Sequence, residues 1–287
     1  MKKFIATIIF CLIIFCASIC SAMKISVLDV GQGDSILIES DTQNILVDTG
    51  PPESREKLMT AISHLPKIDK LIITHPHADH VGNAFYLIEN KPVGMAYDNG
   101  EISASSYYLN YLAGLSMENI ERVTLKAGDV LNIDGATLTF LNPIATYDVN
   151  NNSLVFRLAY GNFSMLFTGD IGFAAEAEIL ASGANVSSTV LKAAHHGAKN
   201  SASYNFVQAV NPEAVIISAG KNNRFKHPSK EAVSIYRRFT NKIYCTAENG
   251  CVTIRTDGQN YQVTPESGSD WLENFELTKE IISVQKI

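Results

Sequence analysis

Cysteine is scarce in this 287-residue sequence, and most of it lies at one end. Of the five cysteines, three occur within the first twenty residues, and only Cys245 and Cys251 lie further along. A dense disulfide framework is therefore excluded as the source of stability. Cys245 and Cys251 flank a turn-like segment between two β-branched runs, which predicts a hairpin. They either form a disulfide across it or pack as two free thiols.

An excess of positive charge is also absent. The chain carries 23 lysines and arginines against 29 aspartates and glutamates, a formal net charge of −6. Such a chain has no general electrostatic attraction for nucleic acid or anionic membranes. Residues 192–230 differ, because Glu213 is the single acid among six basic residues there, which predicts either a basic rim or a solvated face without a partner. These basic residues are Lys192, Lys199, Lys221, Arg224, Lys226 and Lys230.

A long apolar run occurs at one place only. Lys2 and Lys3 precede the run 4–19, and small residues follow at 20–22. This arrangement is typical of a signal peptide over 1–22, with an uncleaved membrane anchor as the alternative. We expect a folded domain over 23–264 and a polar tail over 265–287, both outside the cytoplasm: secreted, periplasmic or at the cell surface. No stable membrane insertion is expected once the signal is removed.

Internal repeats and low-complexity linkers are absent from 23–264, where short β-type runs alternate with amphipathic segments. Strands are predicted at 24–28, 35–38, 45–48, 70–74, 137–142, 154–160, 164–168, 189–193, 214–218, 242–245 and 252–255. Helices are predicted at 55–63, 105–115, 173–181, 204–210 and 229–238. The early strands occur as hairpins and the later ones alternate with helices, which indicates an α/β protein whose sheets are covered by helices.

Histidine is rare, with seven in the chain, yet three lie in one motif. His75, His77, Asp79 and His80 directly follow an apolar strand. Side chains alternate along a chain leaving a strand, so His75 and His77 point the same way, and the other two follow as the next helix begins. Imidazoles and a carboxylate are good ligands for zinc and similar ions. A histidine cluster without metal is the alternative, and the concentration of three in six positions disfavours it.

Further polar residues follow other predicted strands. Asp48 and Asp170 each end an apolar run before a tight turn, where α/β folds collect active-site groups. Alone, each is more typical of a turn or a helix cap. The pair His195-His196 follows a later strand, and His227 lies in an Asn-Asn-Arg-Phe-Lys-His-Pro segment.

In this order, the HxHxDH, Thr-Gly-Asp and His-His-Gly motifs resemble the metallo-β-lactamase superfamily. More narrowly, the chain resembles the extracytoplasmic hydrolase domain of the ComEC competence-protein family and its free-standing relatives. That match depends on the Gly-Gln-Gly-Asp motif within 28–35, on Asn-Ser-Leu-Val at 152–155 and on the segment 222–229. The resemblance implies a four-layer αββα sandwich that carries a binuclear metal-dependent hydrolase.

The resemblance also implies a ligand set. His75 and His77 bind the first divalent ion, Asp79 and His80 the second, and Asp170 bridges them. His196 is the last ligand and His195 its neighbour; zinc is the expected metal, with manganese as the alternative. Many superfamily members have another histidine between the first two motifs, but none occurs from Val81 to Gly169. The segment 150–153 takes that place, which implies one protein ligand fewer, or a water instead, and argues against a β-lactamase.

Two such ions would activate a shared water as the attacking hydroxide. Asp79 is then a candidate proton acceptor, and His195 or His227 a candidate donor to a leaving oxygen. Asp48 is expected to orient histidine ligands. Arg224 and Lys192 are expected to face phosphate charge.

We therefore predict a phosphodiesterase or nuclease acting on a phosphodiester, with DNA as a candidate substrate and no dinucleotide cofactor. A phosphorylcholine esterase, a lactone hydrolase and a non-catalytic metal-binding module are the alternatives.

Overall fold

A computed structural model describes residues 22–144, 148–269 and 271–275. The predicted signal peptide lies outside the described residues except for its last position, and so do residues 276–287 of the predicted tail. Within the described ranges, no helix combines the length and apolar character needed to cross a membrane.

Two mixed sheets form the centre of the fold. The first has eight strands in the order β15-β14-β1-β2-β3-β4-β5-β6, and the second has seven in the order β13-β12-β11-β10-β9-β8-β7. The strands of the first sheet are β1 (Met23–Val27), β2 (Ile36–Glu39), β3 (Asn44–Val47), β4 (Ile68–Ile73), β5 (Val93–Asp98), β6 (Glu121–Thr124), β14 (Val252–Thr256) and β15 (Tyr261–Pro265). Those of the second are β7 (Val130–Ile133), β8 (Ala136–Asn142), β9 (Val155–Tyr160), β10 (Phe163–Phe167), β11 (Val190–Lys192), β12 (Ala214–Ile217) and β13 (Ile243–Cys245).

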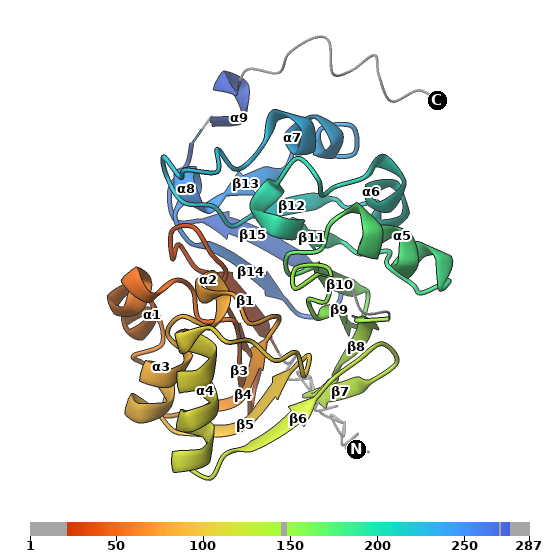
Figure 1. The fold of residues 1–287 in the computed structure, drawn as a ribbon. Coiled ribbons are helices and arrows are strands. Elements are labelled where there is room, and N and C mark those ends of the chain that lie inside the picture. The colour runs from red at the N-terminus through yellow and green to blue at the C-terminus, as the bar shows by residue number, and fades with distance from the viewer. Residues whose placement is uncertain (1–21, 145–147, 270, 276–287) are drawn as a thin grey trace, which may run out of the picture.

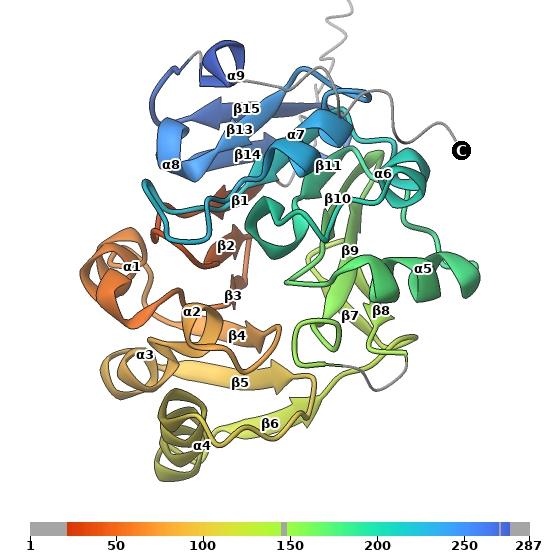
Figure 2. The same cartoon turned by 45° about the horizontal axis from the view of Figure 1, so that its top comes forward.

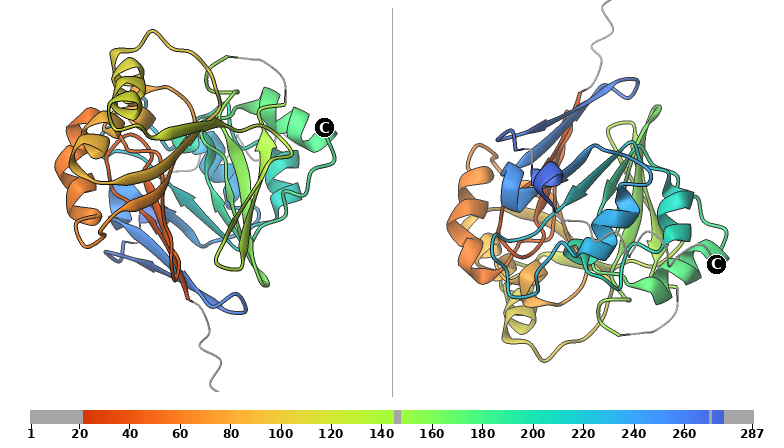
Figure 3. Two further views of the ribbon diagram at one scale, coloured as in Figure 1. Left: turned by 90° about the horizontal axis from the view of Figure 1, so that it is seen from below. Right: turned by 90° about the horizontal axis from the view of Figure 1, so that it is seen from above.

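Helices cover the outer face of each sheet (Figures 1 and 2). The first sheet is covered by α1 (Arg55–Ala61), α2 (Ala78–Val81), α3 (Ala84–Asn90) and α4 (Ser106–Met117). The second is covered by α5 (Phe173–Ala181), α6 (Tyr204–Val210) and α7 (Lys230–Tyr236). Short elements complete the chain: η1 (Pro52–Ser54), η2 (Ala194–Gly197), α8 (Thr246–Asn249) and α9 (Trp271–Asn274). Figure 3 shows the layers edge-on, and the four-layer αββα prediction is confirmed.

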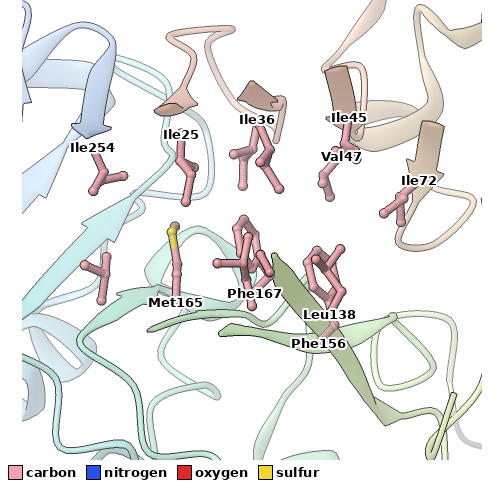
Figure 4. Close-up of a cluster of buried hydrophobic side chains, with 14 of the residues drawn as sticks. Ile25, Ile36, Ile45, Val47, Ile72, Leu138, Phe156, Met165, Phe167 and Ile254 are labelled. Carbon is pink, nitrogen blue, oxygen red and sulfur yellow. The ribbon is translucent and has the colours of Figure 1, made fainter. Parts of the chain in front are cut away.

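Apolar side chains from both sheets form the central core. The inner faces meet through residues such as Ile25, Ile72, Phe156 and Phe167, all nearly inaccessible to solvent (Figure 4). Phe156 and Phe167 stack with ring centroids 4.5 Å apart. Two further apolar clusters join each sheet to its own helices. Burial on both faces explains why these strands are continuous apolar runs in the sequence.

Parallel pairing directs several strand ends to one edge of the molecule. In the first sheet β3 runs parallel to β4, and in the second β10, β11 and β12 run parallel to one another. The carboxyl ends of parallel neighbours lie together, and ligand sites of α/β folds gather there. The predicted functional residues follow these strands.

The cysteine hairpin is a prediction that the structure corrects. Cys245 ends β13 of the second sheet, while Cys251 precedes β14 of the first, and the segment between them forms the helical turn α8. Both cysteines are free thiols. Residues 246–250 therefore cross from one sheet to the other, so no cross-strand pair exists between the two cysteines.

Candidate active site

The predicted site residues come from both sheets and meet at one edge. His75 and His77 follow β4, and Asp79 and His80 lie in α2 immediately after them. Asp170 follows β10, and His195 and His196 lie in η2 after β11. Both sheets therefore contribute to one cluster at the carboxyl ends of their parallel strands.

Asp48 sets the tautomer of His80. It lies after β3, and its Oδ2 is 2.8 Å from Nδ1 of His80. Thr74 holds the same carboxylate, because its backbone N–H donates to Oδ1 and its hydroxyl donates to Oδ2, each at 2.7 Å. A carboxylate accepts, so in the neutral imidazole, which is the form that binds a metal, Nδ1 of His80 carries the proton and Nε2 presents a lone pair. The predicted orienting role of Asp48 fits this geometry.

Backbone oxygen sets the tautomer of His196 in the same manner. Its Nδ1 lies 3.0 Å from the carbonyl oxygen of Ser218, which can only accept. In the neutral form of the ring, Nε2 of His196 is therefore the nitrogen with the lone pair, and it lies 3.4 Å from Asp170 Oδ2 and 3.5 Å from Asp79 Oδ2. Nε2 of each of the two buried histidines, His80 and His196, thus faces Asp170.

His75 and His77 form a separate pair. Nε2 of His75 and Nδ1 of His77 lie 3.0 Å apart. The Thr74 hydroxyl donates its proton to Asp48. The same oxygen can therefore only accept from Nδ1 of His75, which lies 3.1 Å away. Nε2 of His75 is then also a lone pair, 3.9 Å from Asp170 Oδ2. Two ring nitrogens that face each other this closely suit a shared cation.

Asp170 lies between the two groups of histidines. Its Oδ2 is 3.3 Å from Nε2 of His80 and 3.8 Å from Nε2 of His195. Burial alone would raise the pKa of Asp170, but His196 and His80 outweigh it and hold the pKa well below its usual value. Burial likewise opposes the charged form of His80, yet Asp170 and Asp48 raise the pKa of that imidazole well above its usual value. The cluster therefore favours positive charge at its centre.

Several buried polar atoms here have no hydrogen-bond partner. They are Nε2 of His80, Nε2 of His196, Oδ1 of Asp170 and Oδ1 of Asp34. Buried polar atoms are rarely left unsatisfied, and the binding of an ion is one of the recognised reasons for such a group. Ligand atoms of Asp79, His80, Asp170 and His196 all lie within 4.8 Å of one another. The residues present therefore fit a divalent ion in this group, with the His75–His77 pair beside it.

Asn151 and Ser153, in the segment that replaces the usual histidine, hold the Asp170 turn. The hydroxyl of Ser153 accepts from the backbone N–H of Asp170 at 3.1 Å, and Oδ1 of Asn151 accepts from that of Gly172 at 2.9 Å. Gly169 has φ +49°, and a β-carbon there would lie 2.6 Å from that of Ser153. The segment thus supports the turn from beside it, and only glycine fits at its tightest point.

The charged pair Asp34–Lys192 was not foreseen from the sequence. Nζ of Lys192 lies 2.8 Å from Asp34 Oδ2, and both side chains are almost fully buried. The expectation that Lys192 faces substrate is therefore wrong, because its ammonium is enclosed by Asp34 and the carbonyl oxygen of Ala193. Asp34 also approaches Nδ1 of His196 at 3.5 Å. Gly33, directly before Asp34, packs closely against the Asp79 backbone, since a β-carbon at Gly33 would lie 2.4 Å from the Asp79 carbonyl oxygen.

His195 and His227 lie at the rim of the cluster. Their ring centroids are 5.7 Å apart, and the His195 side chain is 23% exposed. His195 and His196 both have left-handed backbone, with φ +49° and +55°, which costs roughly 1–3 kcal/mol per residue and is typical of functional sites. Burial, with His196 and His195 nearby, lowers the pKa of His227 to about 4. The structure thus places His196 in the group and His195 beside it.

A surface groove of about 600 Å³ reaches Asp79. Its lining residues are Gln32, Pro51, Pro52, Glu53, Ala78, Asp79, Tyr107, Asn223, Arg224 and Phe225. Arg224 is exposed, as are Lys199, Lys221 and Lys226, and it is the cation that lines this groove. Of the six basic residues predicted to form a rim, Arg224 is therefore the one that lines this groove.

Fold and site together define a metal-dependent hydrolase built on two sheets. A family model described as the metallo-beta-lactamase superfamily matches residues 28–221. The chain belongs to this superfamily.

Competence proteins are among the curated relatives. The chain is 32% identical over 274 residues to ComE operon protein 3 of Bacillus subtilis, an alignment that covers 87% of this chain and 35% of that protein. It is 30% identical over 243 residues to Recombination protein 2 of Haemophilus influenzae, covering 80% and 28%. These matches confirm the narrower resemblance to ComEC-type proteins. The chain spans about a third of the length of these relatives.

Solved structures share the fold at low identity. The metallo-beta-lactamase fold protein YhfI from Bacillus subtilis matches with a TM-score of 0.57 at 14% identity, over 82% of this chain and 100% of that one. Igni18, a metallo hydrolase from Ignicoccus hospitalis, matches with a TM-score of 0.55 at 16% identity, over 82% and 98%. At these identities the shared property is the fold.

Proposed function

We propose that this protein is an exported, binuclear metal-dependent phosphodiesterase or nuclease. The observation that carries the proposal is the arrangement of lone pairs around Asp170. His75 and His77 face each other on one side of it, His80 and His196 converge on it from other elements, and the groove with Arg224 opens beside Asp79. Extracytoplasmic location rests on the apolar segment 4–19 and on the resemblance to the competence-protein domain.

The protein residues have separable roles in this proposal. His75 and His77 would hold one divalent ion, Asp79, His80 and His196 a second, and Asp170 both; zinc is the expected metal. Such ions lower the pKa of a water and stabilise charge on the attacked centre. Asp48, Thr74 and Ser218 keep the histidine lone pairs directed inwards.

Groups that face the groove act on the substrate. Asp79, whose side chain is 31% exposed, accepts the proton of the attacking water. The guanidinium of Arg224 pairs with non-bridging phosphate oxygens, whose charge grows in the transition state. His227 is neutral at pH 7 and donates one N–H at the rim, to a leaving or a non-bridging oxygen.

Other functions remain as competing proposals. A phosphorylcholine esterase or lactone hydrolase would use the same cluster on a different substrate. A non-catalytic metal-binding module would need the converged ligands but no groove beside them, so the groove that joins Asp79 to Arg224 favours an enzyme.

Hydrolysis of bis-p-nitrophenyl phosphate tests the proposal. Metal-loaded protein should release nitrophenol, and a chelator should abolish release. Arg224→Ala should lower turnover about ten-fold or more with unchanged metal content, because the loss falls on substrate charge. His77→Ala should remove metal and activity together.

Arg255→Ala is the matched control, because Arg255 is equally a surface arginine but lies on β14, outside the groove. Intact phosphodiester hydrolysis in Arg224→Ala would refute the phosphate assignment. So would an equal slowing of an uncharged lactone, and the carbon-ester alternative would then replace it.

A further inference from the structure

Two exposed aromatic side chains line the groove beside Asp79. Tyr107 lies in the first turn of α4, and Phe225 lies in the loop 218–229 that precedes α7. Their exposed fractions are 39% and 52%, high for rings of this size. Neither ring belongs to an apolar core cluster, yet both line the same hollow as a proposed metal ligand. Core packing therefore does not account for them.

Phe225 is held in a fixed setting by its own loop. The guanidinium carbon of Arg224 lies 4.7 Å from the Phe225 ring centroid, and the His227 ring lies 5.6 Å away at an interplanar angle of 25°. Asn223 braces the loop, because its Nδ2 donates to the carbonyl oxygens of Gly220 and His227 and its Oδ1 accepts from the His227 N–H. An exposed ring on a braced loop is prepared to receive a partner.

Resting on the proposed function, we propose that Tyr107 and Phe225 form a stacking subsite that holds a nucleobase of a single-stranded nucleic acid next to the scissile phosphodiester. Aromatic faces bind any base, and Pro51 and Pro52 extend the apolar wall. Gln32 and Asn223 add amide groups that can pair with a base edge.

The charged residues of the groove favour a neutral nucleobase over a quaternary ammonium or a phosphate group. A quaternary ammonium, as in phosphorylcholine, also binds aromatic rings. Here, however, Arg224 lies against Phe225 and repels such a cation. Glu53 lies in the same groove and disfavours a phosphate group in the place of the base. A neutral planar ring with its phosphate towards Arg224 satisfies all of these groups.

A stacking subsite predicts a preference for single-stranded over double-stranded nucleic acid. Bases in a duplex are already stacked and paired, so presenting one to Tyr107 and Phe225 costs unstacking energy. Single-stranded substrate should therefore bind more tightly than duplex of the same length.

Binding of fluorescent oligomers, measured by polarisation on the full chain with chelator present, tests the subsite without any turnover. Oligo(dT) should bind about ten-fold more tightly than an abasic oligomer with the same number of phosphates. Phe225→Ala and Tyr107→Ala should each shrink that ratio. Phe173→Ala is the matched control, because Phe173 is 46% exposed and does not line the groove, and it should leave the ratio unchanged.

Equal binding of the two oligomers by the wild type would overturn the subsite, and so would an unchanged ratio in both groove variants. Displacement of oligo(dT) by phosphorylcholine, lost in Phe225→Ala, would overturn it in favour of a cation cage. These outcomes are separate from the proposed function, which stands or falls on metal-dependent turnover of bis-p-nitrophenyl phosphate.

Discussion

Asp48 illustrates how a buried residue behind the proposed ligands orients one of them. Its carboxylate fixes the proton on Nδ1 of His80. Asp48→Asn keeps the shape but removes the negative charge and one of the two acceptor oxygens, so we expect metal affinity to fall about 10–100-fold. Titration calorimetry with zinc checks this, and Asp134→Asn, a change at an exposed carboxylate away from the site, is the control. An unchanged affinity would show that His80 is oriented by other contacts.

Lys192 and Asp34 give a second prediction at this scale. Removing one partner of a buried pair leaves an uncompensated charge, so Lys192→Met should lower the free energy of unfolding by about 3–5 kcal/mol. The double variant Lys192→Met with Asp34→Asn should recover most of that loss, because neither position then carries a buried charge without its partner. Urea denaturation of the three proteins makes the comparison. If the double variant is as unstable as the single one, packing rather than charge explains the loss.

Site residues could be predicted from the sequence where the proposed ligands lie close together along the chain. His75, His77, Asp79 and His80 lie within six consecutive positions, so their shared chemistry is visible without a fold. The pairing of Asp34 with Lys192 joins residues far apart in the chain, and nothing local indicates it. Lys192 therefore looked like a surface cation, although its neighbours in space enclose it.

At the scale of elements, the turn after β10 decides where Asp170 lies. Gly169→Ala must accept both a left-handed backbone and a contact of 2.6 Å with Ser153. We expect a loss of roughly 1–3 kcal/mol in stability together with loss of bound metal. Gly183→Ala separates the two effects, because Gly183 has φ +73° with no atom within 4 Å of the added carbon. Thermal melting and metal analysis of both variants should show that only the Gly169 change affects metal.

Strand prediction succeeded for buried strands and failed for exposed ones. All eleven predicted strands and all five predicted helices are present, with small shifts at their ends. Edge strands β6, β7 and β15 were missed because their side chains are mostly exposed or half-buried, so no apolar run marks them. The strand β5 was also missed, and its first half is likewise not buried. Side-chain exposure thus hides a strand from hydrophobic patterning, whereas the buried edge strand β13 was predicted.

At the scale of the molecule, the cluster joins the two sheets. An ion that binds the folded chain stabilises it by about 2.7 kcal/mol when its free concentration is 100 times the dissociation constant. Adding zinc to chelated protein should therefore raise the melting temperature. The rise should be smaller in His77→Ala and unchanged in His64→Ala, since His64 lies on the surface against Glu39. No rise in the wild type would indicate that metal does not bind this cluster.

The order of the proposed ligands along the chain has a consequence for biosynthesis. His75, His77, Asp79 and His80 lie in the first half of the sequence, while Asp170 and His196 follow β10 and β11 much later. A polypeptide made from its amino end completes the first histidine motif while the second sheet is still unmade. On the proposed function, metal capture would therefore be a late event in maturation, because a nascent chain that stops short of Asp170 has only part of the proposed ligand set.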